Sequence, residues 1–193
     1  MPVFSNVEEP PQVKPLQQRK NQMVVFGTPV RREEVYTKHF ETLIHACRSL
    51  NVEMIVDIGR SMKSKFSFPL PFIELGNQSA EKISSILSDS RAGFLSYFDG
   101  YLAKSGIFAA YCAHGLLPVM PARNVSELDG IRAGKEYVTP LDISRNELGT
   151  APQTIADNAR LWYNEHSLTK AAAILAAALC QSSDKLDVKI PLD

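Results

Sequence analysis

The sequence has no excess of charge of either sign, because 21 Lys and Arg balance 21 Asp and Glu over 193 residues. A protein whose main partner is nucleic acid or an anionic membrane carries a clear basic surplus. Neither partner is therefore expected as the main one. A local basic pocket for a small anion remains compatible with a neutral chain.

Cysteine is scarce, with only Cys47, Cys112 and Cys180, widely spaced and without a CxxC pair. This usage predicts buried, reduced thiols and a cytoplasmic protein. No apolar run approaches the ~18 residues that span a bilayer. The first residues lack the basic-then-apolar order of a signal peptide, so we expect no transmembrane segment.

Catalytic and metal-binding motifs are also missing. The sequence contains no GxGxxG, GxSxG or HExxH, and its four histidines lack metal-ligand spacing, so no metal is predicted. A small hydrolase or deacetylase is disfavoured because no nucleophile–base pair is evident. A receiver domain with Asp57 as phospho-acceptor is disfavoured too, because Gly27 and Thr28 stand where that fold needs acidic residues.

The first 21 residues are rich in proline and polar side chains, with prolines at 2, 10, 11 and 15. Such a segment does not present an apolar face. We predict a linker or flexible arm over 1–21, as expected if another domain precedes it. Residues 181–193 are predicted to be a polar C-terminal tail.

Residues 22–180 alternate short apolar runs with amphipathic segments. Strands are expected at residues 23–26, 53–58, 71–75, 92–97 and 116–120, with a short last one at 138–139. Helices are expected at residues 34–50, after the N-cap residue Ser79, and at 105–114, 153–165 and 168–179. This order predicts an α/β fold, a Rossmann-like parallel sheet with helices on both faces.

In such sheets the ligand crevice lies beyond the carboxyl ends of the strands, so the loops that follow the strands matter most. One of them runs into a helix through Lys104, Ser105 and Gly106. The helix start offers unpaired backbone N–H groups, Lys104 adds a positive charge, and Gly106 allows close approach. These features favour a phosphate site, although a capped helix beside a solvated lysine has the same spacing.

A second basic loop follows the first strand and carries Gly27, Arg31 and Arg32. Arginine forks match phosphate oxygens, but two solvated arginines at the start of a surface helix remain an alternative. Arg60, Lys63 and Lys65 form a third basic loop, which we interpret as mainly solvated.

Two stretches resemble the C-terminal, donor-binding domain of GT-B glycosyltransferases. In residues 72–119, a strand ending in Leu-Gly precedes a helix, then a strand, a glycine-bearing loop, a second helix and a strand like the family's G-x-P-V-V. Residues 23–36 resemble the family's opening strand and loop, and residues 153–180 its closing helices. The resemblance implies a single half of the two-domain GT-B fold over residues 22–180.

Carried over by position, the resemblance makes Gly27, Arg31 and Arg32 candidates for contacts with the diphosphate of a nucleotide-sugar donor. Lys104, Ser105 and Gly106 become candidates for the phosphates at the helix start. Gly76 would border the nucleoside, and Asp99 and Gly100 would face the sugar. No cofactor or metal is implied, because the protein supplies the positive charge.

The chain departs from the family in two ways. Many retaining members carry two glutamates eight residues apart, whereas the matching positions here hold Leu102 and Ala110. The N-terminal acceptor domain has no counterpart, although catalysis needs groups on both sides of the reacting carbon. We therefore expect a donor-binding domain that needs an acceptor domain or partner chain for transfer. A non-catalytic binding or scaffold module of the same fold is the alternative.

Overall fold

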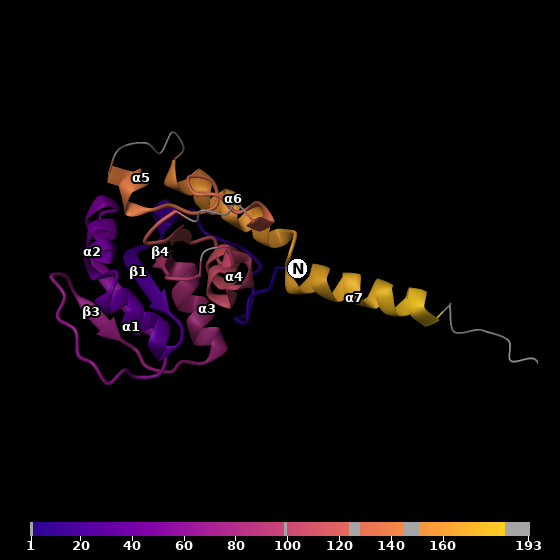
Figure 1. Ribbon diagram of the computed structural model, residues 1–193, viewed down its shortest axis with the longest axis horizontal. Coiled ribbons are helices and arrows are strands. Elements are labelled where there is room, and N and C mark those ends of the chain that lie inside the picture. Colours follow the sequence, from indigo (N-terminus) through magenta and orange to yellow (C-terminus); the bar gives the residue numbers. More distant parts are fainter. Residues whose placement is uncertain (1, 99, 124–127, 145–150, 184–193) are drawn as a thin grey trace, which may run out of the picture.

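A computed structural model describes residues 2–98, 100–123, 128–144 and 151–183 (Figure 1). Five strands form one sheet in the order β3-β2-β1-β4-β5, and all neighbours are parallel. The strands are β1 (Lys20–Phe26), β2 (Met54–Ile58), β3 (Phe72–Glu74), β4 (Ser90–Phe94) and β5 (Leu117–Val119). The predicted Rossmann-like α/β fold is confirmed.

Helices cover both faces of the sheet. They are α1 (Pro29–Thr37), α2 (Phe40–Ser49), α3 (Ala80–Asp89), α4 (Gly106–Ala113), α5 (Pro140–Ser144), α6 (Pro152–Asn164) and α7 (Leu168–Ser183). Because successive strand residues point to opposite faces, Val24 packs in one core with residues of α3 and α4, while Met23 and Val25 pack in the other with residues of α1 and α2. The central strand β1 is thus apolar on both sides, which explains its continuous hydrophobic run.

The prediction of a single helix over residues 34–50 is wrong, because two helices occupy this part of the chain. The first, α1, begins at Pro29 directly after Thr28, since proline suits the first helical position. It ends at Thr37, and α2 begins at Phe40 after His39, whose backbone (φ −115°, ψ 19°) leaves the helical region. Arg31 and Arg32 consequently lie in the first turns of a helix and not in a loop.

The last predicted strand, at residues 138–139, is reduced to one isolated bridge between Val138 and Val119. Strand β4 ends at Phe94, three residues before the predicted end. Helix α5 and the short 3-10 helices at Leu16–Gln18, Leu102–Lys104 and Leu128–Gly130 were not predicted. These are elements of three to five residues, too short to show a hydrophobic period.

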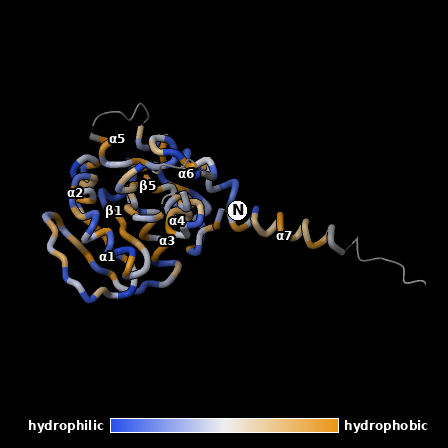
Figure 2. Tube along the Cα trace, in the orientation of Figure 1, coloured by the Kyte–Doolittle hydropathy of each residue, from blue (hydrophilic) through white to orange (hydrophobic). Residues whose placement is uncertain are grey.

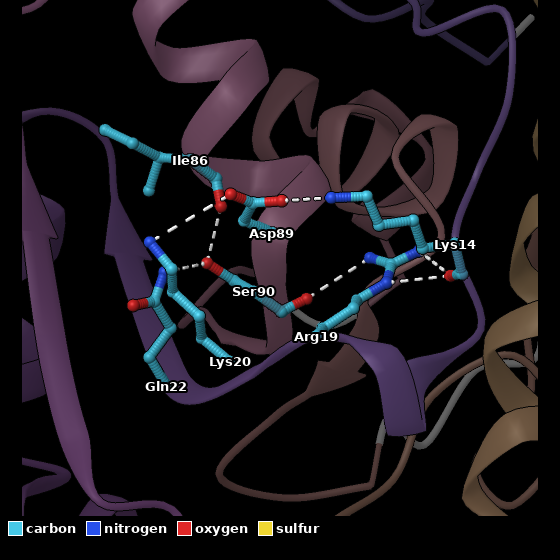
Figure 3. Close-up of polar contacts among 7 residues, drawn as sticks. All are labelled: Lys14, Arg19, Lys20, Gln22, Ile86, Asp89 and Ser90. Atoms are coloured by element: carbon cyan, nitrogen blue, oxygen red, sulfur yellow. Dashed lines mark hydrogen bonds and ion pairs between the residues drawn. The ribbon is translucent and has the colours of Figure 1, made fainter.

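The N-terminal arm, residues 2–19, packs on the domain, although its sequence predicts no apolar contact. Val7 and Leu16 are buried at 5% exposure each. At the amino end of the sheet, Arg19 donates to the carbonyls of Lys14 and Ser90, and Lys14 pairs with Asp89 at 2.7 Å (Figure 3). Two spaced apolar residues and one buried arginine therefore hold a segment that lacks any apolar face. The division of the chain into arm, domain and tail stays a prediction.

At the other end of the chain, α7 projects away from the body (Figure 1). Most of its residues are apolar (Figure 2), and Ile174, Leu175 and Leu179 are each about 60% exposed. A helix that is apolar all round is normally enclosed by other elements. Among the described residues, no helix is both long and apolar enough to cross a membrane.

Candidate functional site

The carboxyl edge of the sheet is built from three consecutive glycine turns. Gly27, Gly59 and Gly76 follow β1, β2 and β3, and all three have positive φ angles. The Gly27 N–H donates to the Ile58 carbonyl at 3.2 Å, and the Gly59 N–H donates to the Gly76 carbonyl at 3.0 Å. A Cβ atom at position 59 would lie 2.3 Å from the Gly27 carbonyl oxygen, so only glycine fits there.

A cavity of about 370 Å³ opens above these turns. Its floor and walls include the apolar residues Phe26, Pro29, Ile58, Ile83 and Ile107. Its polar lining residues are Asn6, Thr28, Arg60, Asn77 and Gln78, and Gly27 and Gly59 complete the lining. An apolar pocket of this size with a few polar groups, beyond the carboxyl ends of parallel strands, is typical of a small-molecule site.

The charge of the cavity is positive and comes from one side chain. Arg60 is the sole cationic residue among those that line it, and none of these lining residues is acidic. Three carboxamides, Asn6, Asn77 and Gln78, both donate and accept hydrogen bonds. Such a lining suits an anion that also carries neutral hydrogen-bonding groups.

Arg32 is fully buried, and its guanidinium bonds only protein acceptors. It donates to the carbonyl of Gly27 at 3.1 Å, to the carbonyl of Arg60 and to the Asp57 carboxylate. The prediction that Arg32 contacts a diphosphate does not fit this geometry. Arg32 instead joins the turns after β1 and β2 from below and thereby holds the cavity floor in place.

The carboxylate that pairs with Arg32 is equally buried. Asp57 also accepts a hydrogen bond from the Tyr36 hydroxyl at 2.6 Å. Burial, with the neighbouring Asp57, raises the pKa of Tyr36, so its hydroxyl stays protonated and remains a donor. Asp57 is thus a structural anion beneath the site, which agrees with the rejection of a phospho-acceptor role.

Arg31 lies on the outer side of α1, above the loop that follows β4. Its guanidinium carbon is 4.1 Å from the ring centroid of Phe98 and 5.5 Å from that of Tyr97. Arg31 also pairs with Glu34 at 3.0 Å. The Tyr97 hydroxyl donates to the Lys104 carbonyl at 3.2 Å, so Tyr97 links Arg31 and Lys104 along one edge of the sheet.

The second predicted phosphate site is only partly as expected. Ser105 caps α4, accepting from the Phe108 N–H at 3.1 Å, but it is buried and its hydroxyl is not presented to a ligand. Lys104 is exposed and ends a 3-10 helix just before α4. Gly106 begins α4, and a Cβ atom there would lie 3.7 Å from the Asn6 carboxamide.

The residues predicted to border the nucleoside and sugar lie around the same edge. Gly76 has open space where a Cβ would point, and it precedes Asn77 and Gln78 of the cavity lining. Gly100 has φ 72° in the loop after β4. Asp99 lies outside the described residues.

Most of the residues that line the cavity are not among the predicted site residues. Of the eight predicted site residues that the structure describes, only Gly27 lines it. Arg60 belongs to the basic loop that we interpret as mainly solvated. Asn77 and Gln78 lie in the loop after β3, and Asn6 lies in the segment predicted as a linker or flexible arm. No local signal marks Asn6, because its position depends on contacts far away in the sequence.

The other titratable groups show no alternative site. Within the described part of the chain, no three His, Cys, Asp or Glu side chains are grouped to hold a metal. Cys47 and Cys112 are buried and unbridged, and burial raises the pKa of Cys47 to about 12. The prediction of a buried thiol is wrong for Cys180, which is exposed on α7. His114 is also buried, with Nδ1 at 2.8 Å from the Ala110 carbonyl.

No protein-family model and no curated protein sequence matches this chain. Solved structures do match. The GtfA/B complex aligns with a TM-score of 0.60 and 10% identity, over 95% of this chain and 39% of the other. The pneumococcal O-GlcNAc transferase GtfA, in complex with UDP and GlcNAc, aligns with a TM-score of 0.55 and 9% identity, over 93% and 38%.

A third structure, an alpha-glucosyltransferase in complex with UDP, aligns with a TM-score of 0.52 and 11% identity, over 85% of this chain and 53% of the other. The matching structures are GT-B glycosyltransferases. At these identities the likeness shows the fold, and it confirms the predicted resemblance at that level. The chain spans between 38% and 53% of the length of these three proteins.

Proposed function

We propose that the cavity at the carboxyl edge of the sheet binds a nucleotide-diphosphate sugar, and that the chain acts as the donor-binding half of a glycosyltransferase. The observation that carries the proposal is the cavity itself. It joins apolar walls, carboxamides and one arginine at the edge where parallel sheets of this kind bind ligands. Two of the solved structures of the same fold contain UDP.

In this proposal the backbone of Gly27 and the side chain of Arg60 contact the diphosphate. Arg31 and Lys104 lie outside the cavity lining, and in this proposal their charges approach the phosphates from the side of the β4 loop, where Tyr97 contacts the Arg31 guanidinium and the Lys104 carbonyl. Gly76 borders the nucleoside, and Gly100 borders the sugar. These groups supply positive charge as the sugar leaves, so the proposal needs neither a metal nor another cofactor.

The test is isothermal titration of the full chain with UDP, GDP and ADP and with their sugars. We expect one nucleotide to bind, and Arg60→Ala to weaken that binding by about 10-fold, the value of one charge-assisted hydrogen bond. Lys63→Ala is the matched control, because Lys63 is an exposed cation of the same loop outside the cavity lining. Absence of binding to all three nucleotides at millimolar concentration would contradict the proposal.

Transfer itself is proposed to need an acceptor-binding domain, in the same protein or in a partner chain. Two observations support this. The chain matches about two fifths of the GtfA/B chain, and α7 leaves an apolar surface uncovered. We expect the 193-residue chain to release no UDP from UDP-sugars at a steady rate, and sustained release would count against the need for another domain. A cytoplasmic location fits the unbridged buried cysteines.

A non-catalytic binding module is the second candidate, and one observation favours it. Leu102 and Ala110 occupy the positions of the retaining glutamates, and both are buried in the core. No carboxylate therefore faces the cavity from these positions. Assays with an added acceptor-domain protein separate the two functions, because only a transferase would then turn over.

A further inference from the structure

The N-terminal arm crosses the molecule beside the start of α4. The Val3 N–H donates to the Ala103 carbonyl at 2.9 Å, which attaches the arm to the turn just before this helix. The Ser5 N–H donates to the Tyr163 hydroxyl at 3.0 Å, which attaches it to α6. Residues far apart in the sequence thus hold the arm at Val3 and at Ser5.

The next residues of the arm are held as firmly. The Ser5 hydroxyl donates to the Val7 carbonyl at 2.8 Å and accepts from the Val7 N–H at 3.1 Å, forming a tight local turn. Val7 is buried in the core shared with α3 and α4. Ser84 donates to the Glu8 carbonyl at 3.2 Å. Glu9 accepts from Tyr163 and from the Leu168 N–H at the start of α7.

Asn6 is the residue of this turn whose side chain faces outward. It is exposed between the buried Ser5 and Val7, and it lines the cavity. Within the described part of the chain, no hydrogen bond joins the Asn6 carboxamide to another residue. The backbone thus holds the carboxamide at the cavity wall, and no described protein group uses its N–H donors or its oxygen acceptor. Both are available to a ligand.

We propose that Asn6 is a binding residue of the site, that its amide donates to a phosphate oxygen of the nucleotide, and that the arm is part of the donor pocket. This rests on the proposed function. The position supports it, since Asn6 shares the cavity with Thr28 and with Arg60, the cation of its lining. The arm also connects the pocket to the start of α7 through Glu9.

The test compares binding of UDP, GDP and ADP to the full chain and to three variants by isothermal titration. We expect Asn6→Ala to weaken binding of the preferred nucleotide by about 3- to 10-fold, the loss of one hydrogen bond. Asn6→Asp should weaken it further, because its carboxylate repels a phosphate. Glu8→Gln is the control, since Glu8 is an exposed neighbour in the arm outside the cavity lining.

A second readout does not depend on affinity. The side-chain amide signal of Asn6, assigned in a ¹H–¹⁵N spectrum by its loss in Asn6→Ala, should shift on addition of the nucleotide. Unchanged affinity in Asn6→Ala together with an unmoved amide signal would overturn the role of Asn6 and leave the proposed function intact. Wild-type affinity in Asn6→Asp would overturn the phosphate contact. Failure of the wild-type chain to bind any of the three nucleotides would overturn both proposals.

Discussion

The two terminal segments of the chain behave in opposite ways. The N-terminal arm is polar and rich in proline, yet Val7 is 5% exposed and the arm reaches the candidate site. Helix α7 is apolar along most of its length, yet Leu175 is 62% exposed and the helix projects into solvent. Mean hydropathy therefore does not decide which segment packs. A few buried and hydrogen-bonded residues hold the arm, whereas most of α7 is exposed and no other described segment covers it.

The largest expected difference between the two segments comes from Val7→Asp in the arm. The change removes an apolar side chain from the core and buries a carboxylate without a partner, so we expect it to lower the free energy of unfolding by about 2–4 kcal/mol. Leu175→Asp in α7 is the counterpart and should change it by less than about 0.5 kcal/mol. Urea unfolding followed by circular dichroism measures both. Equal losses at the two positions would remove the distinction between the segments.

The polar anchor of the arm gives the next largest effect. Tyr163→Phe deletes the hydroxyl that accepts from the Ser5 N–H and donates to Glu9. We expect a loss of about 1–2 kcal/mol in the free energy of unfolding, because a donor and an acceptor lose their partner. Amide hydrogen exchange should also quicken at Ser5 and Val7. Tyr101→Phe, at an exposed ring, should leave both quantities unchanged.

Acidification should loosen the same region. Burial lowers the pKa of His114, whose Nε2 is 3.0 Å from the Ser84 hydroxyl that holds the Glu8 carbonyl. The Arg19 charge also lowers this pKa, while Glu9 and the carbonyls of Ala110 and Glu8 raise it. A histidine with a lowered pKa binds a proton more readily when unfolded, so its contribution is complete above about pH 6.5 and is lost as the pH falls below that value.

The corresponding measurement is the free energy of unfolding between pH 5 and pH 8. We expect a decrease on the acid side that is smaller in His114→Gln, which cannot take up the proton. His45→Gln, at an exposed position, should keep the wild-type slope. A wild-type slope in His114→Gln would show that other groups cause the pH dependence.

The smallest expected effect comes from shortening α7. A chain that ends after Ala171 keeps the Leu168 N–H bond to Glu9, and residues 172–180, which it loses, are exposed. Its melting temperature should differ from that of the full chain by less than about 2 °C, because little buried surface is removed. A large drop would mean that α7 packs on the body in solution.

Much of the fold could be predicted because its signals are local. The apolar run of β1 and the cap residues Ser79 and Ser105 predict their elements, and the structure has them close to the expected positions. The boundary between α1 and α2 could not be predicted, because an apolar period runs on through both helices. The helical backbone is interrupted at His39, although Tyr36 of α1 and Leu43 of α2 pack in the same core.

The candidate site was harder to predict than the fold. Arg31 and Arg32 are neighbours in sequence, and both were candidate phosphate ligands. In the structure Arg31 lies over Phe98, while Arg32 is buried against Asp57. Their helix turns successive side chains by about 100°, so one arginine faces outward and the other faces the sheet. Which one is buried depends on Asp57, 25 residues further along the chain.

The sequence by itself determined the alternation of strands with helices, the parallel sheet and the edge at which a ligand site should form. Hydrophobic period, capping and turn residues act over a few neighbours, and that is enough to specify these features. Tertiary structure alone decided that Arg32 supports the cavity floor, that Asn6 reaches its wall and that α7 stays uncovered. Each of these outcomes depends on contacts between segments that are distant in the sequence. A side chain is buried, or finds its hydrogen-bond partner, only where another segment of the folded chain lies against it.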